Sequence, residues 1–357
     1  MEKELRLMKG NEAVAEAAIR AGTDAYFGYP ITPQSEILEY LMEARPYSTT
    51  GMVVLQAESE IAAINMVYGG AGTGKKCMTS SSSPGISLKQ EGISYIAGAE
   101  LPCLIVNVVG GGPGLGTIQP SQSDYFQSVK GGGHGDYHLI VLAPASVQEM
   151  ADFVELAFDL AFKYRNPVLM LSDGAIGQMM EKVYLKPQKE RAKTFPSWAT
   201  TGKPDTRERN IITSLDLDPL AQEIHNQKLQ AKYREIEKNE VRFEEFQTAD
   251  AEFLLVAYGT SARVCQKAVQ LCRQEGLKTG LLRPITLYPF PSKRISELAS
   301  GMKLILSVEM SAGQMVEDVM LSVCGKTDVS HYGRMGGVLP TPEEVVENLK
   351  SKIKQGI

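Results

Sequence analysis

The chain has 357 residues, of which 43% are hydrophobic and 22% are charged, and its formal net charge at pH 7 is −5. This length and composition predict a folded globular protein of about two domains. The slight acidic excess gives no basis for binding to nucleic acid or to an anionic membrane. No apolar run approaches the roughly 18 residues that a membrane-spanning helix needs.

The cysteines are odd in number and scattered along the chain: Cys77, Cys103, Cys265, Cys272 and Cys324. We therefore expect no disulfide framework, and the lack of any Cys-x-x-Cys pair gives no signal for a zinc site or an iron–sulfur cluster in this chain. Cys265 and Cys272 are seven residues apart on a predicted helix, where core packing is favoured over metal binding. Because residues 1–6 are charged and unlike a secretory signal, we expect a cytoplasmic location.

Residues 1–185 alternate between apolar, β-rich runs and helical patterns, as the chains of parallel α/β sheets do. The predicted strands are 25–29, 53–56, 77–80, 103–109, 139–142 and 168–171. The predicted helices are 11–21, which Gly22 stops, 59–68, and 147–164, which Asn166-Pro167 closes.

Residues 186–250 differ in composition from what precedes them. Pro187, Pro196, Pro204 and many basic residues predict an extended arm to about residue 215, and 219–246 is predicted to be one long polar helix. A second α/β unit is predicted for 251–357. Its strands are 253–257, 279–282, 304–308 and 329–332, and its helices are 262–274 and 314–324.

Two glycine-rich segments invite comparison with phosphate-binding loops. Gly69–Lys76 nearly matches a P-loop, but Lys76 stands where Ser or Thr must hold magnesium, and a helix rather than a strand precedes the segment. A helix-ending turn is favoured there. Gly110–Gly116 fits Gly-x-Gly-x-x-Gly at no spacing. It is either a flexible loop or a ligand-binding loop at the carboxyl end of a strand.

Two further polar segments have both a structural and a functional interpretation. Thr79–Gly85 follows a predicted strand, so its hydroxyl groups form either a polar turn or the wall of a pocket. His134 and His138 could be metal ligands, but no acidic or cysteine partner stands at a suitable spacing. Loop histidines are therefore favoured.

The most informative segments are Gly28–Glu36, which reads GYPITPQSE, and Glu60 within Glu58–Ala63. The first is a strand end entering a turn that offers the Thr32 hydroxyl, and the second places a carboxylate at the start of a helix of small residues. Each alone has a structural interpretation, since such turns are rigid and acidic residues favour the first helical turn. Together, in this order, they resemble the pyrimidine-binding half of a thiamine-diphosphate enzyme, and specifically the alpha subunit of 2-oxoacid:ferredoxin oxidoreductases.

The resemblance extends in colinear order over nearly the whole chain. Further segments that fit are Lys9–Ala13, Gln119–Phe126, Leu169–Gly174, Leu282–Pro289 and Val308–Gln314. The run QPSQSDYF at 119–126 is most similar to the subtype that acts on branched-chain 2-oxo acids, the 2-oxoisovalerate type. The 2-oxoglutarate and pyruvate types are also similar.

The resemblance implies an α/β fold of two domains. A thiamine-diphosphate pyrimidine-binding domain, with helices on both faces of a parallel sheet, would occupy 1–185. An arm and long helix (186–250) would lead to a smaller transketolase C-terminal-like domain (251–357). The resemblance further implies a beta subunit that shares the thiamine diphosphate and holds its Mg²⁺ and a 4Fe–4S cluster, with gamma and ferredoxin-like subunits as further partners. Because the motif Gly-Asp-Gly of a diphosphate site is missing from this chain, the sequence agrees with this division.

The resemblance also implies roles for single residues. Glu60 would be the catalytic residue that hydrogen-bonds the pyrimidine ring nitrogen, and it is preferred over Glu58 because it directly precedes the small-residue helix. Tyr29 and Pro30 would contact the cofactor, Thr32 would bind the substrate, and no metal site is expected here. The implied reaction converts a branched-chain 2-oxo acid and coenzyme A to acyl-CoA and CO₂, with electrons passing through the partner's cluster to ferredoxin.

Position 110 departs from the family pattern. Many relatives carry Arg there, which would bind the substrate carboxylate in a bidentate fashion, whereas this chain has Gly110. Lys75, Lys76 or Lys130, the partner subunit, or a different substrate could account for the missing charge. Two alternative functions stay open: a non-catalytic structural subunit, and a thiamine enzyme subunit that uses an acceptor other than ferredoxin.

Overall fold

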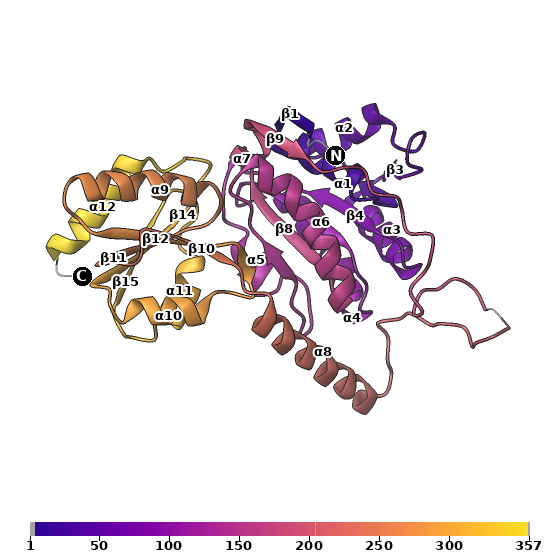
Figure 1. Ribbon diagram of the computed structural model, residues 1–357. Helices are drawn as coiled ribbons and strands as arrows, with labels where there is room; N and C mark the ends of the chain where they lie inside the picture. The colour runs from indigo at the N-terminus through magenta and orange to yellow at the C-terminus, as the bar shows by residue number, and fades with distance from the viewer. Residues whose placement is uncertain (1–3, 204, 356–357) are drawn as a thin grey trace.

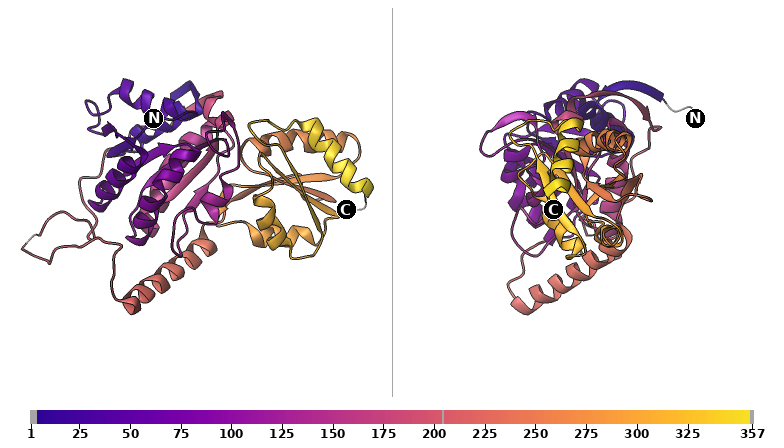
Figure 2. Two further views of the ribbon diagram at one scale, coloured as in Figure 1. Left: turned by 180° about the vertical axis from the view of Figure 1, so that it is seen from behind. Right: turned by 90° about the vertical axis from the view of Figure 1, so that its left-hand side faces the viewer.

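The computed structural model describes residues 4–203 and 205–355. Two α/β units lie side by side, and an arm with one long helix runs along the first unit before the chain enters the second (Figures 1 and 2). The N-terminus lies on the first unit and the C-terminus on the far side of the second.

The sheet of the first unit has eight strands within the described residues, in the order β13-β7-β8-β5-β4-β2-β3 with β6 paired to β5. Its strands are β2 (Ala25–Gly28), β3 (Val53–Gln56), β4 (Cys77–Ser81), β5 (Leu104–Gly111), β6 (Thr117–Pro120), β7 (Ile140–Leu142), β8 (Val168–Asp173) and β13 (Thr286–Tyr288). All six strands predicted for this region are confirmed, and they pair in parallel. Every residue of β5 and β8 is buried, which explains their continuous apolar sequence.

Two groups of helices cover the sheet. One comprises α1 (Gly10–Arg20), α2 (Ser35–Ala44) and α6 (Val147–Tyr164), and the other comprises α3 (Glu60–Gly72) and α4 (Ser83–Gly98). Two short helices, α5 (Tyr125–Val129) and α7 (Gly174–Gln178), complete the unit. The connections through α2 and α6 cross the sheet in one direction and those through α3 and α4 in the other. Because such crossovers are right-handed, the two groups lie on opposite faces.

An antiparallel ribbon of β1 (Glu4–Lys9) and β9 (Met180–Leu185) was not predicted. Both strands carry charged and exposed residues, so neither shows the apolar run that marks the other strands. The ribbon packs on the first unit through Met8, Val183 and Leu185, which form a small core with Val147 and Ala151 of α6.

The arm leads into helix α8 (Pro219–Asn239), whose N-terminus is capped by Asp218 accepting from the Leu220 backbone N–H at 3.0 Å. The prediction of one helix over 219–246 is wrong at its end. The helix stops at Asn239, and β10 (Phe243–Phe246) follows as an edge strand antiparallel to β12. Its sequence, Phe-Glu-Glu-Phe, shows neither the continuous apolar run nor the alternation that would mark a strand.

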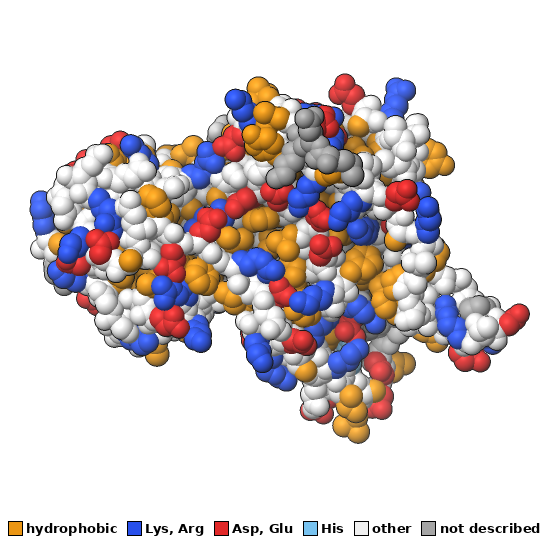
Figure 3. Space-filling model, in the orientation of Figure 1, with side chains coloured by type: hydrophobic (Ala, Val, Ile, Leu, Met, Phe, Trp, Pro, Cys, Tyr) orange, Lys and Arg blue, Asp and Glu red, His pale blue; other side chains and the backbone are white. Residues whose placement is uncertain are grey.

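No helix in the described part of the chain is both long and apolar enough to cross a membrane. On the face shown in Figure 3, positive and negative side chains are intermixed over both units and over α8.

The sheet of the second unit has the order β10-β12-β11-β14-β15, counting described residues only. Its further strands are β11 (Phe253–Val256), β12 (Thr279–Pro284), β14 (Leu304–Glu309) and β15 (Asp328–Gly333), and its helices are α9 (Gly259–Gln274), α10 (Ser292–Ala299), α11 (Met315–Val323) and α12 (Pro342–Gln355). The four strands predicted here are confirmed. Cys265 and Cys272 lie buried on α9 in the core, as predicted.

The two units share a sheet. Strand β13 leaves the second unit and pairs antiparallel with β7, so that Thr286 lies opposite Leu142 and Tyr288 opposite Val141. The Ala143 backbone N–H extends this pairing by donating to the Ile285 carbonyl at 2.8 Å. The first sheet is therefore completed by a strand that comes from within the second unit.

Candidate functional site

The candidate site lies at the carboxyl edge of the first sheet. Strand β2 lies between β3 and β4 in the sheet. Helix α2 connects β2 to β3 on one side, and helix α3 then connects β3 back to β4 on the other side, so the strand order reverses at β2. Ligands of open α/β sheets bind outside the carboxyl ends of the strands at such a reversal. Three segments converge on this point: the turn containing Thr32, the start of α3 with Glu60, and residues Ser80–Ser82 at the end of β4.

Buried hydrogen bonds fix the turn after β2. Asn11 Nδ2 donates to the Pro33 carbonyl at 2.7 Å, which explains the Lys9–Ala13 motif. Gln34 donates to the Tyr29 carbonyl at 3.1 Å and accepts from Ser80 Oγ at 2.5 Å, so the turn is tied to β4. Thr32 itself is exposed, and the Tyr29 side chain is half-buried. The backbone of the turn is therefore held in place while Thr32 stays exposed.

Glu60 is the first residue of α3, and Ser59 caps this helix by accepting from the Ala62 backbone N–H at 3.1 Å. The Glu60 side chain is buried, with 7% of the residue exposed, whereas Glu58 is exposed and accepts from Ser59 Oγ. Among the described residues, the Glu60 carboxylate has no hydrogen-bond partner within 3.5 Å. The carboxylate is therefore free to accept or share a hydrogen bond with a ligand that enters at this edge of the sheet.

Gly85 and Ser81 form a cradle beside this carboxylate. A Cβ atom at Gly85 would lie 2.1 Å from Ser81 Oγ and 2.8 Å from Glu60 Oε1, so only glycine fits there. Ser81 Oγ is buried and has no partner among the described residues. The Ser81 hydroxyl and the Glu60 carboxylate thus meet at the first turn of α4. The segment Thr79–Gly85 is not a turn of its own, since it comprises the end of β4 and the start of α4.

Lys89 was missed by sequence reasoning. It lies one turn after Gly85 on α4 and is fully buried, donating from Nζ to Thr79 Oγ1 at 3.1 Å and to the Glu60 carbonyl at 3.5 Å. Burial lowers the pKa of Lys89 to about 8, although the charge of Glu60 opposes the shift. The available signal was its helical spacing from Ile86 and Ile93, which places Lys89 on the apolar face of α4.

Position 110 borders the same site. A Cβ at Gly110 would lie 3.5 Å from Pro33 Cδ and 3.8 Å from Ser82 Oγ. The lysines considered as substitutes for an arginine are held elsewhere. Lys75 and Lys76 precede β4, at the opposite edge of the sheet, where Lys75 lies 3.3 Å from Asp24.

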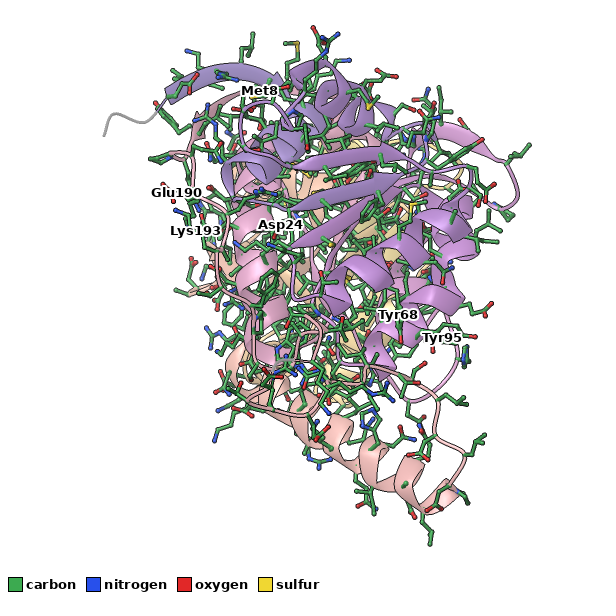
Figure 4. All side chains as sticks on the ribbon, turned by 90° about the vertical axis from the view of Figure 1, so that its right-hand side faces the viewer. Met8, Asp24, Tyr68, Tyr95, Glu190 and Lys193 are labelled. Atoms are coloured by element: carbon green, nitrogen blue, oxygen red, sulfur yellow. The ribbon has the colours of Figure 1, made fainter. Side chains whose placement is uncertain are left out.

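Figure 4 shows Asp24 beside the arm residues Glu190 and Lys193, away from the carboxyl edge. Lys130 forms an ion pair with Asp318 of α11. The interpretation of Lys75 and Lys76 as substitutes is therefore wrong, and Lys130 is engaged by the second unit.

The glycine-rich segments are now placed. Helix α3 ends at Gly72, and Gly74 has a φ of 77°, so the near-P-loop is the helix-ending turn that was predicted. Gly110–Gly116 joins β5 to β6 in a hairpin. It borders a cavity of about 950 Å³ whose other wall comes from residues 310–314 and 335–336 of the second unit.

The two histidines of the loop before β7 lie apart. His134 packs edge-on against Tyr95 of α4, while the His138 ring stacks on Tyr288 of β13 with centroids 4.4 Å apart. Aromatic contacts account for the placement of both rings.

The QPSQSDYF and EMSAGQ motifs fasten the two units together. Gln122 donates to the Tyr258 carbonyl at 2.8 Å and accepts from the Met310 backbone N–H at 3.0 Å. Gln314 donates to the Ser123 carbonyl at 2.8 Å. These contacts set the second unit against the hairpin that follows Gly110.

The remaining motifs are also structural. Glu309 is fully buried and accepts from the Met315 and Val316 backbone N–H groups at 2.8 and 2.9 Å, so it caps α11. Asp173 accepts from Thr260 Oγ1 at 2.7 Å across the interface, and burial raises the pKa of Asp173.

Comparison with known proteins agrees with this geometry. Residues 16–247 match the family model "Pyruvate flavodoxin/ferredoxin oxidoreductase, thiamine diP-bdg", and residues 251–345 match "Pyruvate:ferredoxin oxidoreductase core domain II". The chain is 53% identical to the ketoisovalerate oxidoreductase subunit VorB of Methanothermobacter thermautotrophicus, with 97% of each chain covered. It is 37% identical to the 2-oxoglutarate synthase subunit KorA of Methanocaldococcus jannaschii, covering 96% of this chain and 98% of that one.

Solved structures give the same picture. The 2-oxoglutarate:ferredoxin oxidoreductase from Magnetococcus marinus, with 2-oxoglutarate, coenzyme A and succinyl-CoA bound, superposes with a TM-score of 0.84 at 28% identity, covering 98% of this chain and 66% of that chain. A split-gene transketolase, at 13% identity and a TM-score of 0.61, shares the fold. The family models match residues 16–247 and 251–345, and the fold agrees with them: the strand order of the first sheet reverses next to Glu60, and the QPSQSDYF and EMSAGQ motifs bind the second unit to the first. This chain belongs to the family of 2-oxoacid:ferredoxin oxidoreductase subunits.

Proposed function

We propose that the chain is the alpha subunit of an enzyme that oxidatively decarboxylates a branched-chain 2-oxo acid, such as 2-oxoisovalerate, to an acyl-CoA and CO₂. One observation carries the proposal: at the carboxyl edge where the strand order reverses, the largely buried Glu60 carboxylate makes no hydrogen bond to a described residue and lies beside the fully buried, unpartnered Ser81 hydroxyl. The branched-chain preference is supported by the VorB relatives at 53% identity, compared with 37% for the KorA relative.

The residues present fit the pyrimidine half of thiamine diphosphate. When bound, this cofactor supplies an electron sink for decarboxylation. Glu60 would hold and share a proton at the pyrimidine ring nitrogen, and its burial keeps water from weakening that interaction. Tyr29 and Pro30, in the turn fixed by Gln34, would form the wall against the ring. Thr32, which is exposed, would donate one hydrogen bond from its hydroxyl to the substrate carboxylate or carbonyl.

The remaining parts of the site are proposed to come from partner subunits. A beta subunit would bind the diphosphate with Mg²⁺ and carry the 4Fe–4S cluster, since this chain has no Gly-Asp-Gly motif and no paired cysteines. Gamma and ferredoxin-like subunits, ferredoxin as acceptor, and a cytoplasmic location complete the proposal. The positive charge missing at Gly110 is assigned to the partner, because Lys75, Lys76 and Lys130 are held elsewhere.

The test uses the complex purified through this chain. CoA-dependent viologen reduction is measured with 2-oxoisovalerate, pyruvate and 2-oxoglutarate, and we expect the highest rate with 2-oxoisovalerate. Glu60→Gln should lower that rate by about 100-fold or more, in line with the usual contribution of proton transfer. The matched control is Glu58→Gln, an exposed carboxylate two residues away, which should leave the rate unchanged.

The outcomes separate the alternatives. Full activity of the Glu60→Gln complex would show that Glu60 is not the activating acid. No reduction by a complex that still holds thiamine diphosphate and its cluster would favour a non-catalytic subunit. Turnover with lipoamide instead of viologen or ferredoxin would favour the alternative acceptor.

A further inference from the structure

We propose that Lys89 is a positioning residue for this reaction: its buried ammonium group directs the proton that Glu60 shares with the cofactor toward the pyrimidine nitrogen. The inference rests on the proposed role of Glu60 and adds a second charged group to the site. Lys89 does not touch the reacting atoms; it acts through Glu60.

The geometry places the ammonium group beside the backbone of Glu60. Lys89 is 0% exposed, and Nζ lies 3.1 Å from Thr79 Oγ1 on β4 and 3.5 Å from the Glu60 carbonyl on α3. The side chain thus joins the start of α3 to β4 from within α4. A buried lysine is rare unless something balances its charge, and these two contacts are both to neutral oxygens.

Glu60 is the charged group that faces this lysine. On α3, Glu60 carries the charge that acts on Lys89. On β4, Thr79 offers an uncharged hydroxyl. On α4 itself, the preceding turn carries Gly85, which has no side chain. The Lys89 charge therefore lies buried beside the backbone of Glu60, while the Glu60 carboxylate extends toward Gly85, one turn earlier on α4 and beyond the 4.0 Å of an ion pair with Nζ. A cation beside a carboxylate favours the ionised carboxylate, so a proton shared between Glu60 and a ring nitrogen is shifted toward the nitrogen.

The charge of Lys89 can be removed by pH within a measurable range. Since burial lowers the pKa of Lys89 to about 8, raising the pH from 7 to 9 discharges it in the wild-type protein. Arginine at this position would stay charged throughout, and methionine would never carry a charge. The three proteins thus differ in one property at a known pH.

The experiment measures deuterium exchange at C2 of bound thiamine diphosphate in the assembled complex, without substrate, between pH 7 and 9. Wild type should lose about tenfold in exchange rate through pH 8, the equivalent of one pK unit of electrostatic interaction. Lys89→Met should be slow at every pH, and Lys89→Arg should stay fast to pH 9. Lys76→Met is the matched control: Lys76 is also partly buried, but it donates to the Ala21 carbonyl at the opposite edge and should leave exchange unchanged.

Two results would overturn the inference. One is a wild-type exchange rate that shows no fall through pH 8; the other is a fall of the same size in Lys89→Arg. The Lys76→Met control should follow the wild type at every pH. If Lys89→Met does not assemble, the comparison of wild type with Lys89→Arg decides. Glu60→Gln run beside them separates the two proposals: normal exchange in that variant overturns the role of Glu60, whereas its loss together with an insensitive Lys89 overturns only the role of Lys89.

Discussion

Gln122 holds the two units together, and its removal gives a quantitative test of the interface. The side chain is 2% exposed and makes three hydrogen bonds, to the Tyr258 carbonyl at 2.8 Å, from Ser261 Oγ at 2.7 Å and from the Met310 N–H at 3.0 Å. Gln122→Met keeps the volume but leaves the Met310 N–H and the Ser261 hydroxyl without their acceptor, while the Tyr258 carbonyl still accepts from the Ala262 N–H at 3.1 Å. At about 1–2 kcal/mol for each, the free energy of unfolding should fall by about 2–4 kcal/mol.

Urea unfolding of the full chain, followed by far-ultraviolet circular dichroism, measures this loss. Gln230→Met is the control, because Gln230 donates a single hydrogen bond, to the Asp136 carbonyl at 2.8 Å, in an exposed setting. It should change the free energy of unfolding by less than about 0.5 kcal/mol. A loss of that small size in Gln122→Met as well would refute the view that this side chain fastens the interface.

Three further predictions concern other buried groups. Arg283 makes two hydrogen bonds to Glu149 across the interface, at 2.7 and 2.8 Å. Arg283→Met should therefore lower the free energy of unfolding by about 2 kcal/mol, and Arg283→Lys should lower it by less, because lysine keeps the charge but not the paired hydrogen bonds. Thermal melts measure both effects. The pKa of Lys89 is about 8 in the folded protein and 10.5 for the ordinary group, so the unfolded chain binds more protons between these two pH values. The free energy of unfolding of the wild type should therefore rise by about 2–3 kcal/mol relative to that of Lys89→Met as the pH rises from 8 to 10. A difference between the two proteins that stays constant over this range in chemical denaturation would contradict the prediction. Thiol labelling of the folded chain should modify Cys324, which is exposed, and spare Cys77, where burial raises the pKa to about 12; denaturation should expose all five thiols.

The strands that could be predicted are those whose own residues carry the signal, a continuous run of apolar side chains. Buried parallel strands such as β5 and β8 are apolar along their whole length, so the sequence marks them without knowledge of their neighbours. Strands β10 and β13 carry no such mark, because each is short and is stabilised by a partner far away in the chain. Thr286, for example, pairs with Leu142. The division at residues 185 and 250 stays a prediction.

The candidate site was predictable only in part. Glu60, Thr32, Tyr29 and Pro30 came from a resemblance of motifs, and their roles stay predictions, although the structure brings their elements to one edge. Lys89 could not be found that way, since a lone lysine in a helix is ordinarily exposed and only the packing of α3 on α4 shows it buried.

Because strand β13 of the second unit completes the first sheet, the first unit should not be stable when it is expressed alone. A fragment that ends near residue 250 would lack Thr286–Tyr288 and would leave β7 as a bare outer strand with open N–H and C=O groups. Exposed strand edges template pairing with other chains. Such a fragment should therefore self-associate or precipitate on expression, and supplying the second half in trans should restore its solubility.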